Sequence, residues 1–235
     1  MVIDFDALFL SLKLALWTLA LIIPFGIWVA HALQRMRKGR SWIEALLALP
    51  LVLPPTVLGY YLLVGLGGKS FFGIPLVFSF TGILIASLIV NLPFAIQPIQ
   101  RAFEAIQPEI LEAAQVSGLS HWQIFRLIEL PLAWRGITSA AVLTFAHTLG
   151  EFGVILMVGG AIPGETKTVS IAIYDKVQSF DTAGAGLLSL ILLGTSLVAI
   201  ALSYGVFGRY SSPSKRWEGQ CLRSRFLRHP LIRCN

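Results

Sequence analysis

The sequence predicts an all-α integral membrane protein with five transmembrane helices. Its 235 residues are 56% hydrophobic and only 13% charged, whereas soluble domains carry roughly 25% charged residues. So few charges could not cover a water-facing surface, but a lipid-facing surface needs none. Five long apolar stretches and a one-sided distribution of basic residues indicate the same fold class.

The five apolar stretches define the predicted spans, since a helix needs about 20 mostly apolar residues to cross a bilayer. They are residues 10–33, 43–66, 78–99, 137–158 and 184–207. The apolar stretch 168–177 is too short to cross and is predicted to form a re-entrant or interfacial helix. We expect one transmembrane domain over residues 1–210, followed by a basic, disordered cytoplasmic tail over residues 211–235.

The basic residues predict the orientation of the chain. Of the 18 Lys and Arg residues, 14 fall after the fifth span or in the loops that follow the first and third spans. The remaining four, Lys13, Lys69, Lys167 and Lys176, fall on the opposite side. Because basic residues are retained on the cytoplasmic side, the N-terminus is predicted outside and the C-terminus in the cytoplasm.

The loop between the third and fourth spans, about residues 105–132, carries signals for two short helices. Pro108 suits the first turn of a helix, and Gly118 suits a left-handed position just past its end. Ser120 and Gln123 have the spacing of a capping box that opens a second helix, which we expect Leu130-Pro131 to end. The loop should therefore be a stiff segment on the cytoplasmic face.

This loop resembles the Glu-Ala-Ala coupling motif of the permease subunits of ABC importers. The matching residues are Glu112, Ala113, Ala114, Gly118, Leu130 and Pro131. The resemblance implies the type I importer permease fold, with a coupling helix that docks on a separate ATPase. It also implies a homodimer in a bacterial inner membrane, two cytoplasmic ABC ATPase subunits and an extracytoplasmic binding protein. The alternative is an ordinary helical loop between spans.

Two other stretches resemble molybdate permeases of the ModB type. One is Leu-Pro-Leu-Val-Leu-Pro-Pro at residues 49–55; the other combines Leu-Gly-Glu-Phe-Gly at 149–153 with Ile-Pro-Gly-Glu-Thr at 162–166. The resemblance implies a translocation pathway for molybdate or tungstate, which are similar tetrahedral dianions. Sulfate permeases share the Leu-Gly-Glu-Phe-Gly portion, so a sulfate or thiosulfate permease is the alternative.

A set of residues in the second and fourth spans is predicted to line the pathway or its gate. Prolines free backbone carbonyls, which are tolerated at membrane depth only against protein or water. An ionisable residue such as Glu151 within a span is usually functional. We expect it to brace a gate, or to accept a hydrogen bond at a helix end, with His147 placed to donate to it, rather than to contact a dianion. A packing kink or a satisfied hydrogen bond is the alternative. The predicted residues are Pro54, Pro55, His147, Gly150, Glu151 and Gly153.

No catalytic or metal site is predicted. The sequence has no Gly-x-x-x-x-Gly-Lys-Ser/Thr loop, so ATP and Mg are expected to bind the partner ATPase and no cofactor is expected in this chain. The histidines are scattered, and Cys221 and Cys234 both lie in the tail. The lipid bilayer, and not nucleic acid, is the expected environment. A secondary transporter is a weaker alternative, because inverted repeats and further intramembrane charges are missing.

Overall fold

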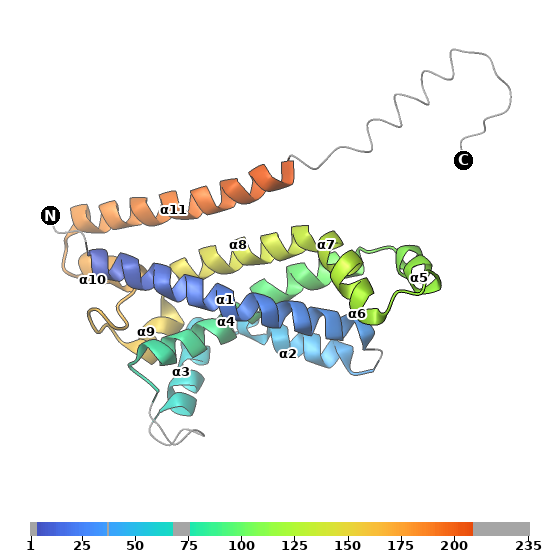
Figure 1. The fold of residues 1–235 in the computed structure, drawn as a ribbon. Coiled ribbons are helices and arrows are strands. Elements are labelled where there is room, and N and C mark those ends of the chain that lie inside the picture. The colour runs from blue at the N-terminus through green and yellow to red at the C-terminus, as the bar shows by residue number, and fades with distance from the viewer. Residues whose placement is uncertain (1–3, 37, 68–75, 209–235) are drawn as a thin grey trace, which may run out of the picture.

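The computed structural model describes residues 4–36, 38–67 and 76–208, and it confirms the all-α fold class over these ranges (Figure 1). The first helices are α1 (Phe5–Arg35), α2 (Arg40–Val52), α3 (Pro55–Leu66) and α4 (Phe80–Glu104). The loop segment contains α5 (Pro108–Val116), α6 (His121–Ile124), the π-helical turn η1 (Phe125–Glu129) and α7 (Leu130–Leu132). The last helices are α8 (Trp134–Gly150), α9 (Gly153–Gly159), α10 (Val169–Gln178) and α11 (Thr182–Gly208). The predicted tail, residues 211–235, lies outside the described residues.

Three single helices, α1, α4 and α11, are long and apolar enough to cross a membrane. They confirm the first, third and fifth predicted spans. Helices α1, α4 and α8 pack against one another in a bundle, and α11 lies along α8 and α10. The predicted short helix is present as α10, and it is fastened to α1 where the Val169 N–H donates to Ser11 Oγ at 2.8 Å.

The second and fourth spans are not continuous helices. Helices α2 and α3 meet at an angle of 107°, and α8 and α9 meet at 60°. Prolines predicted a kink in the second span, but the helix stops completely at Leu53 and Pro54, which both have ψ of 138°, because a residue that precedes proline avoids helical backbone. The second break, at Glu151 and Phe152, was not predicted. The count of five spans holds when each bent pair is one span.

The distal halves of the two broken spans pack against each other (Figure 1). Close approach depends on glycine at two positions. A Cβ added to Gly59 of α3 would lie 2.9 Å from Met157 Cβ and 3.4 Å from Val154 Cα. A Cβ added to Gly153 of α9 would lie 2.8 Å from Pro55 Cβ. The breaks in the two spans therefore lie side by side.

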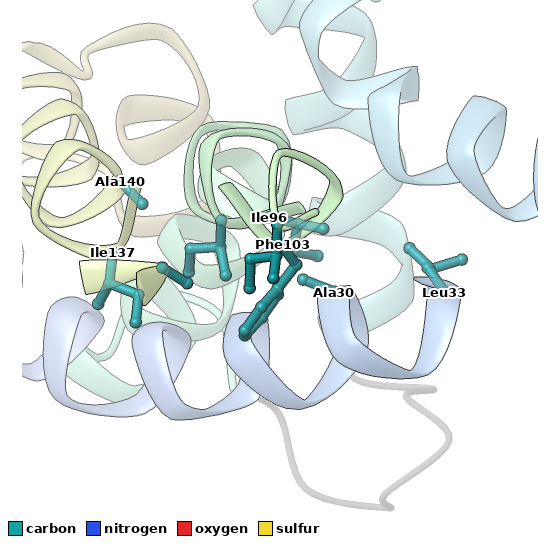
Figure 2. Packing of buried hydrophobic residues seen from close by; sticks show 9 residues of the cluster. Ala30, Leu33, Ile96, Phe103, Ile137 and Ala140 are labelled. Carbon is teal, nitrogen blue, oxygen red and sulfur yellow. The ribbon is translucent and has the colours of Figure 1, made fainter. Parts of the chain in front are cut away.

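An apolar cluster joins α1, α4 and α8 at the opposite end of the bundle (Figure 2). Its buried members are Ala30, Leu33, Ile96, Ile99, Phe103, Ile106, Ala133, Ile137 and Ala140. Ile106 and Ala133 are the residues at which the loop segment leaves α4 and enters α8. The loop segment is therefore anchored at both ends in this cluster, and it projects from the bundle beside the α1–α2 connection (Figure 1).

The glycine contact between α3 and α9 can be tested with two alanine substitutions in one helix. We expect Gly59→Ala to lower the free energy of unfolding by about 1–3 kcal/mol, since it overpacks a closed interface. Gly65→Ala is the control, because a Cβ there meets nothing within 4 Å and alanine favours the helix. Thermal unfolding of the purified proteins compares them, and equal stability of the two variants would contradict the packing.

Candidate functional site

The break between α8 and α9 is organised by the side chain of Glu151. The residue is buried, with 9% of its surface exposed. Its Oε1 accepts a hydrogen bond from the Val154 N–H at 3.1 Å, which satisfies a donor in the first turn of α9. A carboxylate is favoured there because the start of a helix carries partial positive charge. Glu151 thus stabilises the broken geometry of the span.

His147 lies one turn before Glu151, as predicted, but its hydrogen bond goes elsewhere. Its Nδ1 lies 3.2 Å from Oδ1 of Asn91, and its ring stacks on Phe94 with centroids 4.1 Å apart. Asn91 uses its Nδ2 to donate to the Ser87 carbonyl at 2.8 Å, so Asn91 Oδ1 accepts from His147 Nδ1. The other ring nitrogen lies 3.8 Å from Glu151 Oε2, which is too long for a hydrogen bond.

These contacts extend into a chain of polar side chains that crosses the bundle. Ser87 Oγ and Thr18 Oγ1 are 3.0 Å apart, which links α4 to α1. Thr18, Ser87 and Asn91 are all fully buried. We name Thr18, Ser87, Asn91 and His147 the polar chain, which ends one helical turn before Glu151. The sequence analysis missed Thr18 and Ser87, although Ser87 and Asn91 stand one helical turn apart within an apolar span, which is a usable signal.

The other predicted pathway residues surround the two breaks. Pro55 contacts Gly153 closely, as the packing of α3 on α9 requires. Pro54 and Gly150 are exposed on the surface of the single chain. Open space surrounds Gly150, since an added Cβ would meet nothing within 4 Å. The structure therefore brings Pro55 to Gly153 and His147 to Glu151, and leaves Pro54 and Gly150 uncovered.

The loop segment has the predicted helix–break–helix form. Helix α5 ends at Ser117, and Gly118 has φ +80°, the left-handed conformation expected for it. The capping box is present, with Ser120 and Gln123 bonded reciprocally. An added Cβ at Gly118 would meet nothing within 4 Å. Gly118 therefore faces open space from which a partner could approach.

The predicted end of the second helix at Leu130-Pro131 is displaced by a π-helical turn. The Leu130 N–H bonds to the carbonyl of Phe125, five residues earlier, and the helix continues to Leu132. Pro131 has no N–H to donate, and it follows directly after this π-helical turn. Leu130 packs against the apolar cluster, whereas Pro131 is exposed.

The motif residues of α5 divide between two faces. Glu112 and Ala113 are exposed, and Ala114 is buried. Nearby apolar side chains are also exposed: Val116 at 90%, Trp122 at 66% and Leu127 at 61%. The loop segment thus carries exposed apolar side chains on α5, α6 and η1.

One buried polar contact ties the loop segment to α1. His31 Nε2 and Glu129 Oε2 are 2.8 Å apart, with only 7% of the Glu129 side chain exposed. The His31 ring lies between Phe125 and Phe103, at 4.5 Å and 5.9 Å between centroids. Burial raises the pKa of the Glu129 carboxyl, while the nearby Arg35 and His121 act to lower it. The two residues are 98 positions apart, so no local sequence pattern indicates this contact.

Comparison with known sequences places the chain among transport proteins. Residues 22–217 match the family described as binding-protein-dependent transport system inner membrane component. The molybdenum transport system permease protein ModB of Azotobacter vinelandii is 45% identical over 191 residues, which cover 77% of this chain and 84% of the relative. ModB of Escherichia coli K12 is 35% identical, covering 85% of this chain and 92% of the relative. The sulfate transport system permease protein CysT of the same strain is 31% identical, over 75% of this chain and 66% of that relative.

Solved structures show the same fold. A bacterial ABC transporter involved in the import of the acidic polysaccharide alginate matches with a TM-score of 0.73 and 18% identity, over 88% of this chain and 80% of that chain. The alginate transporter in complex with a pentasaccharide-bound periplasmic protein matches with a TM-score of 0.71 and 17% identity, over 85% of this chain and 76% of that chain. The chain thus belongs to the family of binding-protein-dependent transport system inner membrane components, the permease subunits of ABC importers.

Proposed function

We propose that this chain forms the translocation pathway for molybdate in an ABC importer. The observation that carries the proposal is the 45% and 35% identity to two ModB permeases over most of both chains. Identity to the sulfate permease is lower and covers less of that relative. Tungstate has the same shape and charge as molybdate and should share the pathway.

The importer would consist of two copies of this chain, two cytoplasmic ATPase subunits that bind ATP and Mg, and an external binding protein. A five-span bundle is small for an alternating-access pathway, which favours a pair. The basic residues favour an outside N-terminus and a cytoplasmic C-terminus. The positions of two segments support this orientation. The loop segment and the basic α1–α2 connection, both predicted to be cytoplasmic, lie at one end of the helix bundle (Figure 1).

Docking of the ATPase is proposed at the tip of the loop segment, around Glu112, Ala113 and Gly118. The geometry there suits a rigid contact, since α5 and α6 are short helices, α6 begins with a capping box, and the space above Gly118 is open. Both ends of the segment are set in the apolar cluster through Ile106 and Ala133. A displacement of the tip would therefore be passed to α4 and α8 without first unfolding a flexible linker.

The substrate assignment is tested by uptake. Proteoliposomes containing the permease with its ATPase and binding protein should accumulate molybdate when ATP is supplied. We expect tungstate to compete at concentrations similar to those of molybdate, because both are tetrahedral dianions, whereas sulfate should compete weakly. Sulfate uptake at an equal or higher rate would replace this proposal with the sulfate permease alternative.

The docking proposal is tested by two glycine substitutions that impose equal backbone strain. Gly118→Leu should abolish binding-protein-stimulated ATP hydrolysis, because a large side chain holds the two surfaces apart and strains a positive-φ position. Gly39→Leu is the control, since Gly39 has φ +77° and an equally open environment but lies in the α1–α2 connection. Stimulated activity in Gly118→Leu that matches the Gly39→Leu value would contradict docking at this tip.

Glu151 is proposed to hold the gate rather than contact the anion. A carboxylate beside a dianion in a site of low dielectric would be repelled by several kcal/mol, whereas the observed bond to the Val154 N–H needs only an acceptor. Glu151→Gln should therefore retain most uptake, and Glu151→Ala should lose coupling or leak. The two variants are compared by molybdate uptake and by leakage without ATP. Tighter anion binding in Glu151→Gln would instead place the residue in a substrate site.

A further inference from the structure

A groove runs along the flank of α1 beside the loop segment. Its volume is about 460 Å³. It is lined by Pro24, Ile27, Trp28, His31 and Arg35 of α1 and by His121, Trp122, Phe125 and Leu130 of the loop segment. None of these lining residues is acidic. The groove is thus apolar along most of its length and basic at one end.

Polarity changes along the groove in a definite order. From Pro24 to Arg35, α1 advances eleven residues, or about 16 Å. Pro24 and Ile27 are apolar, Trp28 follows, and Arg35 lies at the end of the helix. Trp28 is 68% exposed and Trp122, across the groove, is 66% exposed. A phospholipid at a membrane surface has the same order, from acyl chain through the interface favoured by tryptophan to a charged phosphate.

The basic end of the groove has charge to offer a ligand. Arg35 and His121 form no ion pair with any carboxylate in the part of the chain that the structure describes. The acidic residue that influences this region, Glu129, is buried and bonded to His31. A guanidinium group matches phosphate oxygens in geometry and charge. The unpaired Arg35 guanidinium, with the His121 imidazole as a further hydrogen-bonding group in the lining, therefore favours an anionic occupant.

We propose that this groove binds an anionic phospholipid. The phosphate diester lies at Arg35 and His121, and one acyl chain lies against Pro24, Ile27 and Trp28. The bound lipid then contacts both α1 and α6, so it fills the space beside the His31–Glu129 bond and supports the loop segment against the bundle. Basic pockets between helices at a membrane surface are known to suit such headgroups.

A protein partner fits the groove less well. An ATPase subunit docked at the tip of α5 meets Glu112 and Gly118, which are not part of the lining. The groove instead follows α1 back to Pro24, well within the apolar helix. A soluble subunit could not reach that depth in a bilayer, whereas an acyl chain lies there naturally. A second copy of this chain is the remaining candidate, and it is an outcome of the test below.

The proposal is tested by lipid retention in the purified permease. Protein from bilayers with equal phosphatidylglycerol and phosphatidylcholine is examined by native mass spectrometry for bound lipid. We expect selective retention of phosphatidylglycerol, and Arg35→Gln should reduce that preference about fivefold, the effect of one cation near a lipid phosphate. Arg35→Lys should preserve most of the preference, which separates charge from misfolding. Lys38→Gln, which removes one charge at the same end of the bundle but outside the lining, should leave it unchanged.

Four results would overturn the proposal. Equal loss of preference in Arg35→Gln and Lys38→Gln would show general surface attraction without a site. Displacement of the lipid by inorganic phosphate would show a free-anion site. A photoactivatable phosphatidylglycerol should cross-link to the peptides that carry Trp28 and Trp122, and cross-linking elsewhere would place the lipid outside the groove. Cross-linking of Trp28 to a second copy of this chain would make the groove a dimer interface.

Discussion

Every backbone polar group inside a bilayer must find a partner within the protein, and this constraint shapes the two broken spans. At one break, Glu151 accepts from the Val154 N–H, and the Ser170 hydroxyl donates to the Leu149 carbonyl at 2.8 Å. The far end of α9 is closed when the buried Thr166 hydroxyl donates to the Gly159 carbonyl at 2.6 Å. Side chains thus replace the helical bonds that the break removes, and irregular backbone becomes possible within the bundle.

The breaks and the loop segment are connected by rigid structure. The distal halves α3 and α9 pack through glycines, and the polar chain links α1 and α4 to His147 of α8, one turn before the break. At the other end of the bundle, the apolar cluster around Phe103 holds both ends of the loop segment. Close-packed interiors transmit displacement with little loss. The loop segment and the breaks are thus joined through packed structure, which supports the proposed coupling.

Sequence reasoning succeeded where the signal was local. Length and hydropathy gave α1, α4 and α11, and neighbouring residues alone specify the left-handed Gly118 and the capping box at Ser120. It failed where distant residues decide the geometry. The contact of α3 with α9 and the His31–Glu129 bond both join residues far apart in the sequence. The prolines predicted a kink in the second span but not its angle of 107°.

We propose that the two breaks form the moving part of the pathway, and cysteine accessibility tests this proposal most directly. Cysteines at Pro54 and Gly150, both exposed in the single chain, are introduced after Cys221 and Cys234 are replaced by serine. A charged thiol reagent should label both at rates that change together when ATP binds to the reconstituted importer. A cysteine at Leu16, on the exposed apolar face of α1, should stay unreactive. Rates at positions 54 and 150 that are independent of nucleotide, or as low as at Leu16, would contradict the account.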